Sequence, residues 1–155
     1  MNRMKPFHFS LQAVATVREN EESLAREAYA CAVRQQRQIA ARQQEVESSI
    51  HEGLAEQGEV LNREGSAAKA AQIQAALRVL RARLQEISAE AVRFQATVDE
   101  KWRLLLSAQQ RCQTLAKVRD RQVAVHQAEE ARQVQLGLDE MAALRASGGL
   151  GYKTG

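Results

Sequence analysis

The sequence predicts an all-α protein, in which two long helices form an antiparallel coiled coil, a helical hairpin, and the second helix is longer than the first. Three observations carry this prediction. Only 4% of the 155 residues are aromatic, proline occurs once, and apolar residues recur at three- and four-residue steps over two long stretches. Alanine is the commonest apolar residue, so the buried surface is expected to be a narrow seam and not a globular core.

The first helix is expected over residues 10–61, after an N-terminal segment of residues 1–9 that contains Pro6. Ser10 is a candidate N-cap, because serine side chains accept hydrogen bonds from the first amides of a helix. The apolar steps contain extra four-residue intervals near Ile39 and Leu54, which predict a locally unwound supercoil. The candidate seam residues of this helix are Val14, Val17, Leu24, Ala28, Cys31, Ile39, Val46, Ile50, Leu54 and Leu61.

The chain is expected to reverse over residues 62–66, where helix-breaking residues gather. Asn62 is the candidate for the left-handed residue that ends the first helix, and Ser66 is the candidate N-cap of the second. Gly58 is an alternative hinge.

The second helix is expected over residues 67–146, followed by a flexible tail of residues 147–155. Two apolar columns with a spacing of seven predict its seam. Both columns become polar from Arg119 onward, where the shorter first helix would end. We therefore expect an unpaired overhang from about Arg119 through Met141. The two columns are Ile73, Leu80, Ile87 and Phe94, and Leu77, Leu84, Ala91, Val98, Leu105 and Cys112.

The sequence offers no pattern typical of an enzyme, a metal site or a cofactor site. The three histidines are far apart, and there is no glycine-rich phosphate loop. The 22 basic and 19 acidic residues are interspersed, which argues against nucleic acid and anionic membranes as partners. No stretch is apolar enough to span a bilayer. Cys31 and Cys112 would lie out of register for a disulfide, and two cysteines without a secretory leader favour the cytoplasm.

Two further features have a plain and a functional interpretation. Trp102 lies beside the seam position Lys101, so it either packs along the flank of the coiled coil, which we favour, or marks a docking site. Four arginines on the second helix are expected to form a solvated face, with an acidic partner surface as the alternative. They are Arg78, Arg81, Arg83 and Arg93.

Four separated motifs, in order along the chain, resemble the flagellar export protein FliJ family. The opening contains Phe7, Phe9, Leu11, Val14 and Arg18 at the family's spacing. The others are the mid-helix Lys101-Trp102-Arg103, the run Arg119-Asp120-Arg121-Gln122, and the late Leu138-Asp139-Glu140-Met141-Ala142.

The resemblance implies a non-enzymatic coiled-coil protein of the cytoplasm, peripherally associated with the export apparatus of the inner membrane. It would bind the ring of the flagellar export ATPase and the export gate protein FlhA, and would contact export chaperones. Its role would be to couple the ATPase to protein export, without covalent chemistry at any residue.

The resemblance also implies which residues meet which partner. The two chain ends would meet the ATPase, through Phe7, Phe9, Leu11, Val14, Leu136 and Met141. A patch early in the second helix would meet the gate, at Ala76, Leu80, Arg83 and Ile87. Leu80 and Ile87 also belong to the predicted seam, so for them a structural role is the safer interpretation.

Three alternatives remain open from the sequence. The first is the equivalent stalk protein of a virulence type III secretion system, against which the Phe-x-Phe-x-Leu opening argues. The second is a general scaffold that forms homodimers through its second helix. The third is an amphipathic protein of the membrane surface.

Overall fold

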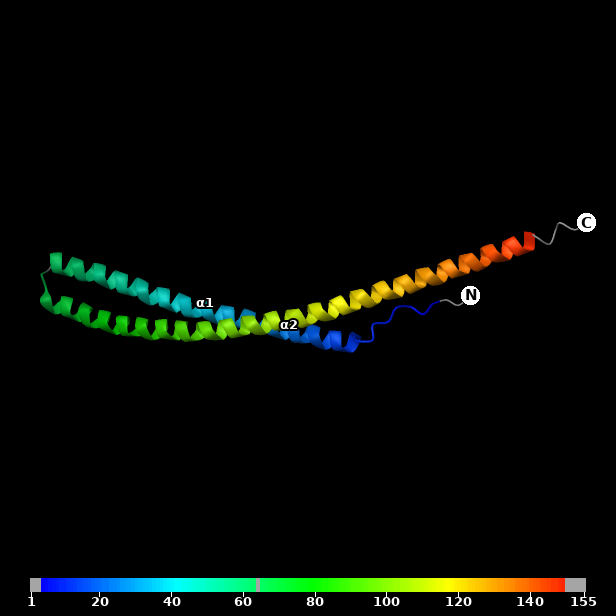
Figure 1. Cartoon of the computed structure of the whole chain (residues 1–155). Coiled ribbons are helices and arrows are strands. Elements are labelled where there is room, and N and C mark those ends of the chain that lie inside the picture. The colour runs from blue at the N-terminus through cyan, green and yellow to red at the C-terminus, as the bar shows by residue number, and fades with distance from the viewer. Residues whose placement is uncertain (1–3, 64, 150–155) are drawn as a thin grey trace, which may run out of the picture. The chain divides into compact units, whose positions relative to one another are not determined.

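The computed structural model describes residues 4–63 and 65–149 and contains two α-helices within those ranges. Helix α1 spans Gln12–Arg63 and helix α2 spans Ala67–Gly149 (Figure 1). The chain divides into two compact units. One unit comprises Glu21–Ala108, and the other comprises Met1–Asn20 together with Gln109–Gly155.

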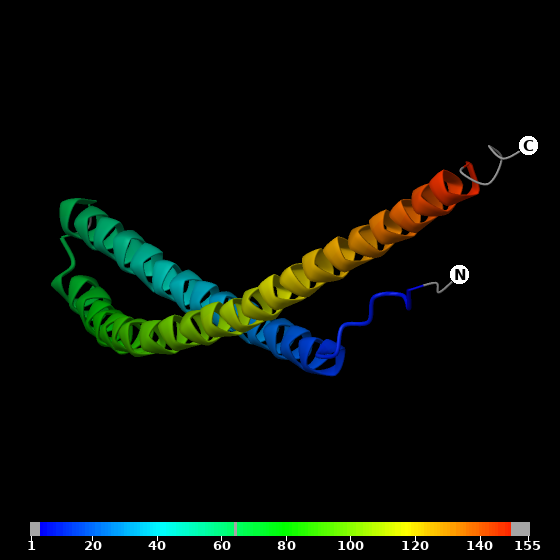
Figure 2. The ribbon, with the colours of Figure 1, turned by 45° about the vertical axis from the view of Figure 1, so that its right-hand side comes forward.

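In the unit Glu21–Ala108, α1 and the first half of α2 run antiparallel and side by side (Figures 1 and 2). Side-chain contacts between the two helices occur at intervals along their length, and they show which residues of α1 and α2 face one another. They include Gln57 with Gln74, Arg42 with Glu90, and Tyr29 with Trp102. The predicted antiparallel helical hairpin, with a longer second helix, is confirmed.

The seam of α2 follows the two predicted columns. Leu77 is 1% exposed, and Ile87, Val98 and Leu105 are buried. Ile87 forms a core cluster with Ile39 and Val46 of α1, against which Leu80, Leu84, Ala91 and Phe94 pack. Burying these apolar side chains is the main favourable contribution to the pairing of the two helices.

The seam of α1 differs from the prediction. More than half of its expected residues are exposed, among them Leu24, Leu54 and Leu61 at 67%, 44% and 54%. Twelve covered positions instead alternate by three and four residues without interruption, so the predicted irregular steps near Ile39 and Leu54 are wrong. These positions are Glu22, Ala25, Tyr29, Ala32, Gln36, Ile39, Gln43, Val46, Ile50, Gly53, Gln57 and Val60.

Small and amide side chains therefore occupy much of the α1 seam, and they complement the larger side chains of α2. Gln57 donates from Nε2 to Gln74 Oε1 at 2.7 Å, and Gln36 donates in the same way to Gln95. Gln43 Nε2 lies 3.4 Å from Ser88 Oγ. Such cross-helix amide pairs satisfy polar groups inside the seam and favour one register over others.

The turn falls within the expected residues 62–66, but Asn62 does not make it. Asn62 and Gly58 both lie within α1, so neither ends the helix. Gly65 has a positive φ of 55° and donates its amide to the Val60 carbonyl at 3.1 Å, which satisfies one of the last carbonyls of α1. Ser66 caps α2 as predicted, with its Oγ 3.4 Å from the Lys69 amide.

The remaining element boundaries differ from the expected ones by two or three residues. Helix α1 begins at Gln12 and not at Ser10, and the Leu11 carbonyl accepts the amide of Ala15 at the helix start. It ends at Arg63 and not at residue 61. Helix α2 continues to Gly149, past the expected end at residue 146; residues 150–155 of the predicted tail lie outside the described residues.

Because Gly53 has no side chain, the Leu77 side chain of α2 packs closely against the backbone of α1 there. A Cβ atom built on Gly53 would lie 2.8 Å from Leu77 Cδ2, closer than side chains pack, whereas one built on Gly58 would meet no atom within 4 Å. Both glycines lie inside α1, where glycine costs about 1 kcal/mol of stability relative to alanine.

We therefore predict that Gly58→Ala raises the free energy of unfolding by about 0.5–1 kcal/mol. Gly53→Ala is predicted to give no such gain, because the new methyl group must displace the fully buried Leu77 side chain. Thermal unfolding followed by circular dichroism measures both. Equal stabilisation by the two substitutions would contradict the close packing at Gly53.

Candidate functional site

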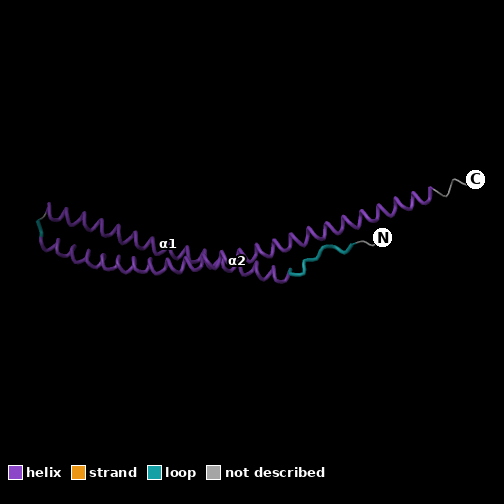
Figure 3. The backbone as a smooth tube through the Cα atoms, viewed as in Figure 1, coloured by secondary structure: helices purple, strands orange, loops and turns teal. Residues whose placement is uncertain are grey.

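The candidate site lies in the unit that contains residues 4–20 and 109–149 of the described chain, where α2 extends beyond the start of α1. Residues 4–9 precede α1, form neither helix nor strand, and are drawn as a loop in Figure 3. We call this segment the strap. The Phe9 carbonyl accepts the Gln12 amide at 3.1 Å, which turns the chain from the strap into α1.

The strap is fixed to α2 mainly by Phe9, which is 5% exposed. Phe9 lines a small cavity of about 120 Å³ together with Ala15 of α1 and Cys112 and Leu115 of α2. Because Cys112 and Leu115 continue the two seam columns of α2, Phe9 prolongs the seam just before the start of α1. Burying a phenylalanine side chain contributes about 2–3 kcal/mol, which is enough to hold a short segment in place.

His126 forms the second attachment of the strap. Its ring packs edge to face on Phe7, with ring centroids 5.7 Å apart and an interplanar angle of 71°. His126 Nε2 lies 3.1 Å from the Lys5 carbonyl oxygen. Because a carbonyl oxygen can only accept a hydrogen bond, Nε2 is the donor and carries the hydrogen.

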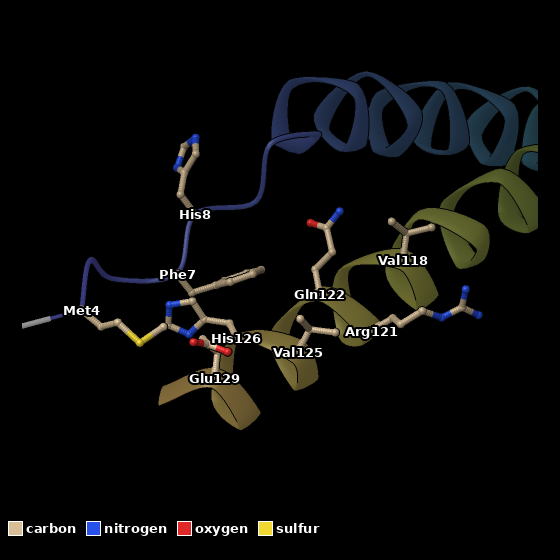
Figure 4. Close-up of a pocket in the computed structure, with 9 residues that line it drawn as sticks. All are labelled: Met4, Phe7, His8, Val118, Arg121, Gln122, Val125, His126 and Glu129. Carbon is tan, nitrogen blue, oxygen red and sulfur yellow. The ribbon is translucent and has the colours of Figure 1, made fainter. Parts of the chain in front are cut away.

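A hollow of about 560 Å³ lies between the strap and α2 (Figure 4). Its walls are largely apolar, and come from Met4 and Phe7 of the strap and from Val118 and Val125 of α2. Polar side chains complete the lining. They are His8, Arg121, Gln122, His126 and Glu129.

The unpaired part of α2 begins later than predicted, because the strap covers part of the helix. We predicted that α2 would be unpaired from about Arg119, but the strap covers Gln122, His126 and Glu129, which are all half-buried. From Glu130 to Gly149 every residue is exposed. We call this stretch the overhang. Its large exposed apolar side chains are Val134, Leu136, Leu138, Met141 and Leu144.

The residues predicted to meet the ATPase divide into two groups. Phe9 is buried and Phe7 is half-buried, so both hold the strap on α2. The other four residues are exposed. They are Leu11 at 37%, Val14 at 42%, Leu136 at 52% and Met141 at 53%.

Of the residues predicted to meet the gate, two lie in the seam and two are exposed. Ile87 is 6% exposed in the core cluster, and Leu80 packs against that cluster. Ala76 and Arg83 are exposed. Arg83 lines a shallow hollow beside Arg42 and Glu90, whose side chains form an ion pair across the two helices at 3.0 Å.

Trp102 stays on the flank of the seam, as the favoured interpretation expected. Its ring lies 5.2 Å from that of Tyr29, and the residue is 44% exposed. The four arginines of α2 that were expected to be solvated are all exposed. Cys31 is exposed and not in the seam, whereas Cys112 is half-buried, and neither cysteine forms a disulfide.

Sequence reasoning missed Val118 and His126 as residues of a possible site. The signal was present in the α2 columns, which continue through Cys112, Arg119 and His126 at a spacing of seven. Polar residues at these positions indicated an unpaired helix. The structure covers His126 with the strap, a non-helical segment that has no periodicity to detect.

Within the described ranges, neither helix has a stretch long and apolar enough to cross a membrane. Over the same residues, no three or more His, Cys, Asp or Glu side chains are grouped so that they could hold a metal ion.

A family model described as flagellar FliJ protein matches residues 7–150, a range that includes part of the strap and both helices. A search of curated proteins and a search of solved structures each find no match. The resemblance seen in the short motifs is thereby confirmed over most of the chain. The chain belongs to the flagellar FliJ family of helical, non-catalytic components of flagellar protein export.

Proposed function

We propose that this protein couples the flagellar export ATPase to the export gate, as a non-enzymatic component of the type III export apparatus. It binds the ATPase ring with its chain ends, binds the gate protein FlhA with α2, and contacts export chaperones. It works in the cytoplasm, peripherally associated with the inner-membrane export apparatus. The family match and the exposed overhang support this proposal.

The overhang is the single observation that carries the proposal. Every side chain in the helical stretch from Glu130 to Gly149 is exposed, yet the stretch includes large apolar side chains such as Leu136 and Met141. Most of the stability of a helix in a protein comes from packing of its apolar face, and this stretch has no such packing. An apolar stretch that is left uncovered in this way is typical of a surface that becomes buried against another protein.

The ATPase contact can be tested at Met141. We predict that Met141→Asp weakens binding to the purified export ATPase by at least about tenfold, because it places a charge in a buried apolar contact. Isothermal titration calorimetry measures the affinity. The matched control is Leu104→Asp, since Leu104 precedes the overhang on α2 and is 51% exposed, close to the 53% of Met141.

Two results would count against this contact. Either the unmodified protein does not bind the ATPase, or the Met141 and Leu104 variants bind equally well. Circular dichroism of both variants establishes that their helix content is unchanged, so that a loss of affinity reports on the contact itself.

The gate contact is proposed on the exposed side of the early part of α2. Ala76 and Arg83 are accessible there, while Leu80 and Ile87 fix the helix from within the seam. Arg83 is the charged residue of this group, and it borders a hollow that also includes the exposed Val79. An arginine beside an apolar side chain is a common centre of protein interfaces.

We predict that Arg83→Glu weakens binding to the soluble domain of the gate protein by at least about tenfold, since it reverses the charge at the centre of the contact. Arg93→Glu is the control, because Arg93 is also an exposed arginine of α2. Surface plasmon resonance with immobilised gate domain compares the two. Equal affinities would remove Arg83 from the contact.

A further inference from the structure

Four apolar side chains of the overhang lie in a row along one side of the helix. Ala131, Val134, Leu138 and Met141 follow one another at steps of three, four and three residues, the spacing of a helix seam. We call this row the apolar stripe. All four residues are exposed, and the exposed fractions of Val134, Leu138 and Met141 are 58%, 55% and 53%. The stripe therefore has the pattern of a helix contact, although no described residue of the chain covers it.

The charged residues within the length of the stripe project from other sides of the helix. Because each residue turns an α-helix by about 100°, Arg132, Asp139 and Glu140 lie at least about 120° from the centre of the stripe. Gln135 Nε2 donates to Asp139 Oδ1 at 3.0 Å, along the flank of the helix. This part of the overhang is thus amphipathic, which is typical of a helix that packs against another helix.

The strap leaves this side of α2 uncovered. It covers Gln122, His126 and Glu129, which are half-buried. The two residues that continue the stripe toward the strap, Ala124 and Gln127, are exposed. A second helix could therefore lie along the whole stripe without displacing the strap.

The two ends of the stripe carry opposite charges. Glu130 directly precedes Ala131, and Arg145 occupies the next position of the stripe, four residues after Met141. Two antiparallel copies would place Glu130 of each copy at the same end as Arg145 of the other, whereas two parallel copies in register would bring like charges together. The charges therefore fit a second copy of this chain in the antiparallel orientation.

The apolar side chains also match in this orientation. When Val134 of one copy faces Leu138 of the other, Met141 faces Ala131 in the next layer, because both pairs have the same sum of residue numbers. The twofold axis repeats both pairs on its other side. Each layer then combines a larger side chain with a smaller one, as the seam of the hairpin does.

Gly137 lies beside these layers, close to the axis. A Cβ atom built on Gly137 would meet no atom within 4 Å, so nothing in the chain itself requires a glycine there. Glycine inside a helix is destabilising relative to alanine. A second helix that approaches closely would account for it, in the way that Gly53 makes room for Leu77 within the hairpin.

We propose that two copies of this protein associate through the apolar stripe, with their overhangs antiparallel. Only four stripe residues of each copy take part, compared with roughly 20–30 residues a side in a stable interface, so the dimer is weak and forms at high protein concentration. At low concentration the protein is a monomer with an uncovered overhang. Because Met141 also belongs to the proposed ATPase contact, the dimer and the ATPase complex exclude one another. The inference goes beyond the proposed function and does not depend on it.

Sedimentation equilibrium of the full chain, from about 10 μM to about 1 mM, measures the self-association. Leu138→Asp is expected to weaken it at least about tenfold, because the carboxylate would be buried in an apolar contact. Leu136→Asp is the matched control, since Leu136 is 52% exposed, close to the 55% of Leu138, but projects from the opposite side of α2. The control is expected to associate as the unmodified protein does. Circular dichroism establishes that both variants keep their helix content.

The charges at the ends of the stripe test the orientation of the two copies. Glu130→Arg and Arg145→Glu are each expected to weaken the association several-fold, since each brings like charges together in an antiparallel dimer. The double variant is expected to restore the association, because opposite charges then face one another again.

Three results would overturn the inference. A protein that stays monomeric over the whole concentration series would leave the stripe to a different partner. Equal weakening by Leu138→Asp and Leu136→Asp would exclude the stripe as the contact. A double charge variant that associates no better than the single variants would exclude the antiparallel arrangement. The ATPase takes no part in these measurements, so the proposed function stands or fails separately.

Discussion

The packing of large apolar side chains from α2 against small and amide side chains from α1 is the interaction on which the hairpin depends. Leu77 is fully buried against Gly53, and Ile87 packs with Ile39 and Val46. The two helices contribute unequally to this seam, because α2 supplies most of the apolar bulk. The glutamine pairs between them add little net energy, but they penalise any shift of register that would leave an amide unpaired.

The same asymmetry decides how much could be predicted from the sequence. The α2 seam was predictable, because leucine and isoleucine at a spacing of seven are typical of a helix that packs along another helix. The α1 seam was not, since Gln36, Gln43 and Gly53 carry no hydrophobic signal and exposed residues such as Leu24 carry a misleading one. A pattern along one helix reports on that helix alone, whereas the fit between small and large side chains is a property of the pair.

The candidate site could likewise be predicted from the sequence only in part. The exposed apolar stretch after Glu130 was predictable from the unequal helix lengths, and the FliJ family was predictable from four short motifs. The strap did not follow, because its position depends on Phe9 filling a space between two helices and on His126 reaching the Lys5 carbonyl. These contacts join residues about a hundred positions or more apart, and no local pattern in the sequence encodes them.

Helix α2 is covered by α1 and the strap as far as Glu129, and the proposed function requires the export ATPase to cover the overhang beyond it. Amide hydrogen exchange of α2, measured with and without the ATPase, tests this requirement most directly. Residues 77–105 are expected to exchange slowly in both states. Residues 130–149 are expected to exchange fast in the free protein and markedly more slowly in the complex. Equal protection of residues 130–149 in both states would contradict the proposed coupling through the overhang.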